Sequence, residues 1–227
     1  MSQTFSHLRV SSEYSITQGL LTIDQIVENA SRFEVPSVAL TDKSNMFGLV
    51  KFFNKCESAG IKPISGASIQ LIFDDDESSF EVLCLAKTND GQKNLMKIIS
   101  TAHSNNSFNT PIIQFEDLSQ LQNDIVVISG GKGSHIYEYL RRDNIDEANK
   151  KIEVFRKAFD EDFLLEVQKT NRIDELDYFK NVIPLSIEKG IPVIATNDIL
   201  FSSKDDYETH ETKVCINTCL LYTSDAA

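Results

Sequence analysis

The sequence predicts an α/β fold in which strands and helices alternate around a closed or nearly closed parallel barrel. Short apolar runs repeatedly end in polar clusters, and amphipathic stretches of helical period follow those clusters. The glycine fingerprint of an open dinucleotide-binding sheet is missing. The clearest junction is the run Ser37–Thr41 followed by Asp42–Asn45, so we expect Asp42 at the mouth of the barrel.

The elements before residue 90 begin this alternation. Thr22–Gln25 has the sequence of a capping box, so a helix is predicted to begin there. Gly60 is expected to end a second helix, because glycine readily adopts the left-handed conformation of a C-cap. Strands are predicted over residues 5–10, 37–41 and 80–86, two apolar stretches broken at Ser65–Ser68 over 62–73, and helices over 22–33 and 46–59.

The second half of the chain continues the same pattern. Asp90 can cap a helix, residues 104–110 form a loop rich in Asn and Ser, and Gly190 is expected to end a long helix. Almost entirely apolar runs predict buried strands, and helical spacing of apolar residues predicts helices between them. The strands are expected over residues 124–129, 163–167 and 191–196, and the helices over 90–104, 134–142, 145–159, 174–189 and 204–215.

Two loops have a functional alternative. The acidic run Asp74–Ser79 is interpreted as a solvated hairpin tip. A calcium loop is the alternative, but the Gly and the later Glu of an EF-hand are missing from this run. The turn Gly130–Ser134 can cradle a phosphate with its backbone N–H groups, but neither GxxxxGK[ST] nor GxGxxG is present. A tight turn is therefore the preferred interpretation.

Composition restricts the class of protein. The 227 residues, 41% of them hydrophobic, suffice for one α/β domain with a sizeable core. A net charge of -12 opposes direct binding of a nucleic-acid backbone. The four cysteines lack a CxxC spacing, and no apolar run has membrane-spanning length or the pattern of a leader, so a reduced, cytoplasmic protein without membrane contact is expected.

Functional side chains are expected at the carboxyl ends of the strands, where the loops of a barrel converge. These positions hold Arg9, Ser11, Asp42, Lys43, Ser68, Glu166, Asn197 and Asp198. A zinc-like centre requires several convergent His, Asp or Glu ligands, and only carboxylates are available here. For Glu166 we favour a salt-bridge role over that of a remnant ligand, and for His7 a structural role.

Several ordered motifs carry a resemblance to a known family. They are His-Leu-Arg-Val-Ser-Ser-Glu-Tyr-Ser at 7–15, Ala-Leu-Thr-Asp at 39–42 with Asn45 and Gly-Leu-Val-Lys-Phe at 48–52, Gly-Ile-Lys-Pro-Ile-Ser-Gly at 60–66, and Ala-Thr-Asn-Asp at 195–198. From about residue 5 to 217, the chain resembles the amino-terminal PHP (polymerase and histidinol phosphatase) domain of bacterial DNA polymerase III alpha subunits. The resemblance implies a distorted seven-stranded, TIM-like β/α barrel.

The resemblance also implies where metal ligands would lie. Metal-binding members have His-x-His after the first strand, Asp-His after the second, a Glu on the third, then a Cys or His, a further His and a closing Asp-x-His. Here Asp42, Glu166 and Asp198 remain among the vestigial metal-site positions, and the other positions hold Arg9, Ser11, Gln18, Lys43, Ser68, Gly131, Thr170 and Leu200. No metal is therefore expected. We expect Arg9 or Lys43 to form an ion pair with a retained carboxylate.

By this resemblance, the chain is a non-catalytic scaffold that docks the proofreading exonuclease and other replicase subunits. The parent chain would be a magnesium-dependent DNA-directed DNA polymerase, which contacts DNA through palm, fingers and thumb domains beyond residue 227. One alternative is an active metal-dependent phosphoesterase, a pyrophosphatase or a 3′-5′ exonuclease, that uses metal-bound hydroxide. Another is an unrelated α/β domain that binds a small molecule or partner.

The resemblance ends close to the end of the sequence. Residues 1–217 are predicted to be the PHP domain, and residues 218–227 depart from the family pattern. We interpret this tail as a foreign segment after a truncated reading frame and expect it to pack poorly.

Overall fold

The computed structural model describes residues 5–74, 78–104, 110–129, 131–170 and 175–218. The chain has an α/β fold with a seven-stranded sheet of order β1-β2-β3-β5-β6-β7, in which β4 also pairs with β2. Two compact units make up the chain: residues 1–64 with 198–227, and residues 65–197. We call them the first unit and the second unit, and the strand β2 (Lys62–Ile72) contributes residues to both.

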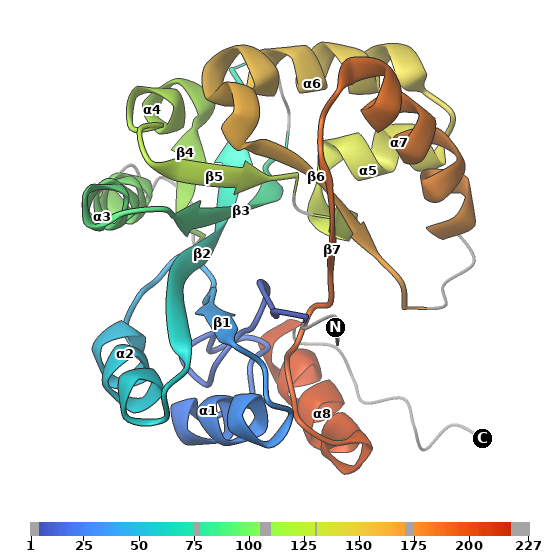
Figure 1. Ribbon diagram of the computed structural model, residues 1–227. Helices are drawn as coiled ribbons and strands as arrows, with labels where there is room; N and C mark the ends of the chain where they lie inside the picture. Colours follow the sequence, from blue (N-terminus) through green and yellow to red (C-terminus); the bar gives the residue numbers. More distant parts are fainter. Residues whose placement is uncertain (1–4, 75–77, 105–109, 130, 171–174, 219–227) are drawn as a thin grey trace, which may run out of the picture. The chain divides into compact units, whose positions relative to one another are not determined.

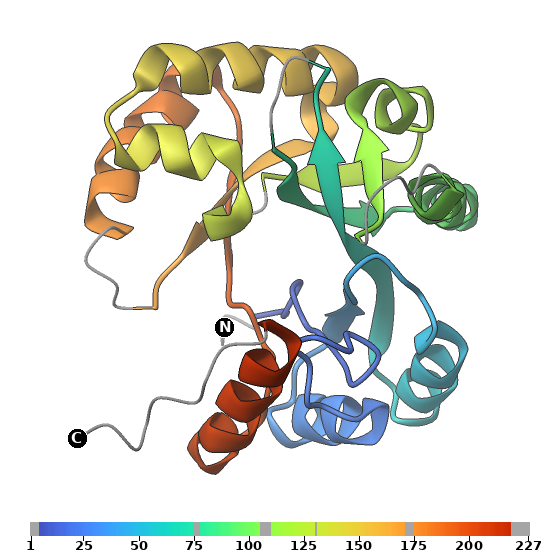
Figure 2. The ribbon, with the colours of Figure 1, turned by 180° about the vertical axis from the view of Figure 1, so that it is seen from behind.

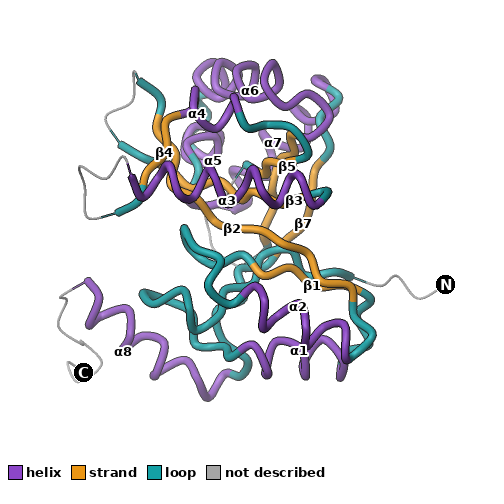
Figure 3. The backbone as a smooth tube through the Cα atoms, turned by 90° about the vertical axis from the view of Figure 1, so that its left-hand side faces the viewer, coloured by secondary structure: helices purple, strands orange, loops and turns teal. Residues whose placement is uncertain are grey.

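The first unit contains three α-helices, one short 3-10 helix and one complete strand in its described part (Figure 1). The predicted capping box is confirmed at Thr22 and Gln25, and α1 and α2 pack side by side (Figure 3). The core between them contains Ile23, Ile26 and Phe52. The elements are α1 (Ile23–Arg32), β1 (Ser37–Leu40), α2 (Leu49–Ser58), the short 3-10 helix Lys204–Asp206 and α8 (Tyr207–Thr218).

The second unit contains most of the sheet and the helices that cover it (Figures 1 and 2). The helices α3 and α4 contact β4, α5 packs between α6 and α7, and α6 and α7 contact β6. The strands are β3 (Phe80–Ala86), β4 (Ile112–Gln114), β5 (Ile125–Ile128), β6 (Phe163–Gln168) and β7 (Val193–Thr196). The helices are α3 (Asn89–Ser104), α4 (Phe115–Gln120), α5 (His135–Arg141), α6 (Ile145–Phe159) and α7 (Glu175–Lys189).

The prediction of a parallel barrel is wrong for β3, which runs antiparallel to both β2 and β5. The antiparallel pairing of β2 with β3 confirms the hairpin predicted around the acidic run Asp74–Ser79. The pairing of Leu71 with Phe80 shows the reason, because the connection between β2 and β3 is a short hairpin. A parallel crossover needs about a dozen residues or more, and this connection is too short to return the chain. The pairs β2–β4, β5–β6 and β6–β7 are parallel.

Three local predictions also need correction. The segment Ser65–Ser68 does not interrupt β2, because its small side chains are buried inside one continuous strand. The segment Phe5–Val10 forms isolated bridges from His7 to Val38 and from Val10 to Ile199 rather than a regular strand. The helix expected from Met46 begins at Leu49, and β4 and α4 were not predicted.

The two loops with functional alternatives are turns where they are described. Asp74 is exposed at the end of the β2–β3 hairpin, and residues 75–77 lie outside the described residues. The glycine-rich turn forms the 3-10 helix Gly131–Gly133, and the Ser134 hydroxyl then accepts a hydrogen bond from the Tyr137 N–H to cap α5. Gly130 and the predicted foreign tail after Thr218 also lie outside the described residues. No helix among the described residues has the length and apolar character needed to cross a membrane.

Candidate functional site

The loop after β1 is fixed to the amino-terminal segment by Thr41. The Val10 N–H donates to the Thr41 hydroxyl oxygen over 2.9 Å, and the same hydroxyl donates to the Val10 carbonyl oxygen over 3.1 Å. A backbone bond from the Thr41 N–H to the Val10 carbonyl adds to this contact. These bonds hold the end of β1 beside residues 10–15 and bring Asp42 against the serines of that segment.

The serine–aspartate cluster, formed by Ser12, Ser15 and Asp42, is the central feature of this loop pair. The Ser12 N–H and the Ser15 hydroxyl each donate to Asp42 Oδ1 over 2.7 Å. The Ser12 hydroxyl donates to Asp42 Oδ2, also over 2.7 Å. The Ser15 hydroxyl oxygen in turn accepts the Lys43 N–H over 3.0 Å. All three members are buried, so the cluster joins two loops by a short polar network inside the first unit.

Burial raises the pKa of Asp42 above its ordinary value, while the hydrogen bonds from Ser15 and Ser12 oppose this shift. In the described part of the chain, Asp42 accepts only these serine hydrogen bonds. The predicted ion pair between Asp42 and Arg9 or Lys43 is therefore wrong for this carboxylate. An ion pair of Arg9 or Lys43 with Glu166 or Asp198 stays a prediction.

The remaining candidate positions of the first unit lie along neighbouring backbone segments. Arg9 and Ser11 are buried, and the Ser11 N–H donates to the Ile199 carbonyl oxygen. The carbonyl oxygen of Leu200 accepts the Leu20 N–H, whereas Asp198 is exposed. These contacts place Ser11 beside the segment after Asp198. The half-buried Gln18 donates its N–H to the Ser15 carbonyl oxygen.

In the second unit, Glu166 is fully buried, and hydrogen bonds connect it to residues of neighbouring elements. The Thr196 hydroxyl and the Gln168 amide both donate to Glu166 Oε1, the amide over 3.2 Å. The Glu166 N–H donates to the Ser129 hydroxyl oxygen over 2.9 Å, and the Tyr178 hydroxyl donates to the Glu166 carbonyl oxygen over 2.6 Å. Glu166 is thus held by Ser129, which directly follows β5, and by residues of β7 and α7.

Gly131 approaches the Glu166 carboxylate so closely that it leaves no room for a side chain. A Cβ atom at Gly131 would lie 2.9 Å from Glu166 Oε2 and 3.1 Å from Gln168 Cδ, and the φ of Gly131 is +54°. By the resemblance described above, metal-binding members are expected to have a Cys ligand at this position. Glycine is required here both for backbone conformation and for space.

The last two candidate positions of the second unit, Ser68 and Thr170, have different surroundings. Ser68 is buried on β2, and its hydroxyl lacks a hydrogen-bond partner among the described residues. Thr170 contacts the start of α7, where its N–H and its hydroxyl both donate to Glu175 Oε1, the N–H over 2.8 Å. Thr170 therefore orders the helix start and does not face a carboxylate cluster.

The donor set does not fit a multi-metal centre. Within residues 5–74, 78–104, 110–129, 131–170 and 175–218, no group of three or more His, Cys, Asp or Glu side chains could hold a metal ion. Both oxygens of Asp42 already accept short hydrogen bonds, and Gly131 supplies no ligand atom. Divalent metal centres need several convergent donors, so we derive no catalytic step through a metal.

A model of the PHP domain matches residues 7–170. The chain belongs to the PHP domain family. Its curated relatives include the DNA polymerase III alpha subunit of Escherichia coli (strain K12), which is 35% identical over 94% of this chain and 18% of the relative. The corresponding subunit of Vibrio cholerae is 33% identical over 94% of this chain and 19% of the relative.

The chain spans about a fifth of the length of these relatives. Solved structures show the same fold at low sequence identity. A Bifidobacterium adolescentis protein, described as a metal-dependent phosphoesterase, aligns with a TM-score of 0.60 and 11% identity over 93% of this chain and 96% of its own. A Chromobacterium violaceum amidohydrolase aligns with a TM-score of 0.54 and 12% identity over 92% and 96% of the two chains.

Sequence patterns located the carboxylates but not their partners. Ser12 and Ser15 were not among the candidate site residues, although both bind Asp42 directly. The available signal is the polar cluster Ser11–Ser15, which directly follows the predicted strand 5–10. Thr196 was likewise seen as the end of a strand rather than as the donor to Glu166.

Proposed function

We propose that this chain is the PHP domain of a bacterial replicative DNA polymerase alpha subunit and that it works as a non-catalytic scaffold. The similarity to DNA polymerase III alpha subunits over 94% of the chain supports the first part. The polymerase reaction would belong to palm, fingers and thumb domains of the parent chain, with magnesium as cofactor. The site of action would be the bacterial cytoplasm.

The single observation that supports the scaffold role is that both carboxylate oxygens of Asp42 already accept hydrogen bonds. A carboxylate that served as a metal ligand would direct its oxygens to the ion, whereas both oxygens of Asp42 accept short hydrogen bonds from buried serine groups. The replacements at Lys43 and Gly131 also remove ligand atoms that metal-binding members use. The residues of the old metal site would now connect loops and strands.

A scaffold of this family needs partners, and we propose the proofreading exonuclease subunit and other replicase subunits in this role. The domain carries a net charge of -12, so direct contact with DNA would be made by other parts of the parent chain. We expect the purified chain to bind the proofreading exonuclease subunit from the same bacterium. We also expect that the chain by itself extends no primer.

The second candidate function is a metal-dependent phosphoesterase reaction, either as a pyrophosphatase or as a 3′-5′ exonuclease. The retained carboxylates Asp42, Glu166 and Asp198 favour it, as does the similarity in fold to a protein described as a metal-dependent phosphoesterase. Metal-bound hydroxide would be the nucleophile in such an enzyme.

One experiment separates the two candidates. Zinc, manganese and magnesium are titrated into the metal-stripped chain by calorimetry, and hydrolysis of pyrophosphate and of single-stranded DNA is followed with each ion. We expect no stoichiometric binding, no hydrolysis, and retention of the proofreading exonuclease on the immobilised chain. Stoichiometric metal together with turnover that is lost in Asp42→Asn and Asp198→Asn would overturn the scaffold role. Loss of exonuclease retention alone would overturn only the partner assignment.

A further inference from the structure

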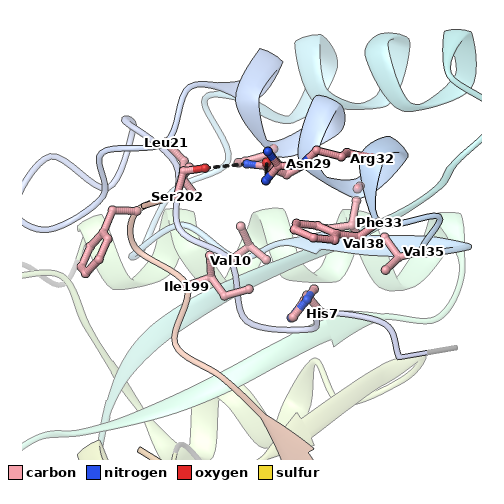
Figure 4. Close-up of a pocket in the computed structure, with 13 residues that line it drawn as sticks. His7, Val10, Leu21, Asn29, Arg32, Phe33, Val35, Val38, Ile199 and Ser202 are labelled. Atoms are coloured by element: carbon pink, nitrogen blue, oxygen red, sulfur yellow. Dashed lines mark hydrogen bonds between the residues drawn. The ribbon is translucent and has the colours of Figure 1, made fainter. Parts of the chain in front are cut away.

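The first unit contains an apolar pocket of about 240 Å³ that has no role in the proposed scaffold (Figure 4). It lies between the second half of α1, β1, the segment before residue 10 and residues 199–202. Its apolar wall is formed by Val10, Leu21, Ile26, Ala30, Phe33, Val35, Val38, Ile199 and Phe201. Phe33 is 66% exposed, so its ring forms part of the pocket mouth.

The charge of this pocket differs from the charge of the whole chain. The chain has 34 acidic residues and a net charge of -12, yet no Asp or Glu lines the pocket. Its polar groups are His7, Asn29, Arg32 and Ser202. Arg32 thus brings a positive charge to an otherwise apolar lining that contains no acidic residue, and such a lining suits a ligand that combines an apolar group with a negative charge.

Arg32 is available for such a ligand. Its guanidinium donates to Asn29 Oδ1 over 2.8 Å and lies 4.6 Å from the centre of the Phe33 ring. Within the part of the chain that the structure describes, Arg32 has no carboxylate partner. By contrast, Lys51 and Lys55 on α2 both form ion pairs with Asp24. The guanidinium thus keeps most of its donors for a carboxylate at the pocket mouth.

One hydrogen bond and one buried atom without a partner describe the remaining polar groups of the pocket. The Asn29 side-chain amide donates to the Ser202 hydroxyl over 2.8 Å, which joins α1 to the segment before α8 (Figure 4). The Nδ1 atom of His7 is buried and lacks a hydrogen-bond partner in the described structure. A buried polar atom without a partner costs free energy, and a peptide N–H or C=O that enters the pocket can supply the missing bond.

The size of the pocket favours a side chain over a complete small molecule. Pockets for small ligands and cofactors occupy about 300–1,000 Å³, and this pocket has only about 240 Å³. Anchor side chains at protein interfaces fill small, apolar pockets of this kind. We propose that the pocket binds a peptide segment of a partner protein, inserting a large apolar side chain while an adjacent carboxylate pairs with Arg32. This proposal does not depend on the proposed replicase function.

The test uses two synthetic peptides, acetyl-Asp-Phe-Asp-amide and acetyl-Lys-Phe-Lys-amide, and the methyl NMR signals of the isotope-labelled chain. We expect saturable shifts of the Val10, Val38 and Ile199 methyl groups, with the acidic peptide bound about fivefold more tightly than the basic one. Arg32→Glu should reverse this preference, and Phe33→Ala should weaken both peptides. Both side chains are exposed, so neither variant removes a core contact.

Arg142→Glu provides the matched control, because it makes the same charge change on an exposed arginine of the second unit. This variant should keep the preference for the acidic peptide. The proposal is overturned if the pocket methyl groups show no saturable shift up to the solubility limit, or if Arg32→Glu leaves the preference unchanged. Equally tight binding of acetate or inorganic phosphate would overturn the peptide assignment. If the chain self-associates and Arg32→Glu abolishes that self-association, the occupant of the pocket would be a second copy of the chain. This result would overturn the assignment to a separate partner protein.

Discussion

Replacement of Asp42 is the most direct test of the serine–aspartate cluster. Asp42→Ala removes the acceptor of three donors, namely the Ser12 N–H, the Ser12 hydroxyl and the Ser15 hydroxyl. A buried donor left without a partner costs about 1–3 kcal/mol. The hydroxyl groups can rotate toward other acceptors and a buried charge is lost, so we expect a net destabilisation of about 2–4 kcal/mol. A loss of about 3 kcal/mol corresponds to roughly 6–12 °C in Tm for a chain of this size.

Asp42→Asn should be far milder. The amide oxygen can still accept from the Ser12 N–H and the Ser15 hydroxyl, and the amide N–H₂ faces the Ser12 hydroxyl, which can turn to accept. We expect its free energy of unfolding to lie within about 1 kcal/mol of that of the wild type at neutral pH. Urea denaturation of the wild type and both variants measures these differences.

The pH dependence gives the sign of the Asp42 contribution. Burial raises the pKa of Asp42, so its carboxyl group stabilises the fold most below its unfolded pKa, and this stabilisation is lost as pH rises through the folded pKa. Asp42→Asn lacks this titration. The stability of the variant relative to the wild type should therefore increase from about pH 3.5 to about pH 7.

Asp24→Asn provides a control with the opposite sign. Hydrogen bonds from Lys55 and Lys51 lower the pKa of Asp24, so its contribution is present above the unfolded pKa and is lost as pH falls through the folded pKa. The stability of this variant relative to the wild type should decrease with rising pH. Equal losses of several kcal/mol in Asp42→Asn and Asp42→Ala, or a pH-independent difference for Asp42→Asn, would refute the reasoning.

Three further predictions concern the second unit and the thiols. Thr196→Val removes the hydroxyl that donates to the buried Glu166 carboxylate and should cost about 1–3 kcal/mol in urea denaturation, whereas an unchanged midpoint would contradict this role. Gly131→Cys restores the family residue but places a Cβ 2.9 Å from Glu166 Oε2 at a φ of +54°, so its Tm should fall by several degrees and no metal should be gained. Burial raises the pKa of Cys84 to about 12, so native Cys84 should resist a thiol reagent that labels the half-buried Cys215, as peptide mapping can verify.

Local patterns predicted the elements whose signals lie within a few residues. The capping box at Thr22 and Gln25 fixes the start of α1, and Gly60 adopts a φ of +69° after α2. Periodicity placed α6 over the predicted residues, and the apolar runs placed β5 and β6 to within a residue or two. Backbone capping and side-chain spacing are local properties, so the sequence alone expresses them.

Features that depend on distant residues were predicted in part or not at all. The direction of β3 was predicted only in part, because the acidic run Asp74–Ser79 indicated its hairpin with β2 while the alternation of strands and helices favoured a parallel barrel, and a hydrophobic run has the same appearance in either direction. The strand β4 has only three residues, too few for a periodic signal, and it exists because it pairs with β2. The small residues Ser65–Ser68 look like a turn in sequence, but pairing of that segment with β3 keeps it extended.

The candidate site shows why a retained residue does not imply a retained reaction. Asp42 and Glu166 are buried carboxylates that the resemblance places among the vestigial metal-site positions, but the chemistry of each carboxylate depends on the groups that donate to it. Serine hydroxyls bind Asp42, and a threonine hydroxyl and an amide bind Glu166. Removal of either buried carboxylate would leave these donors without acceptors. This cost would keep both residues in place through folding stability alone, with no need for a metal ion.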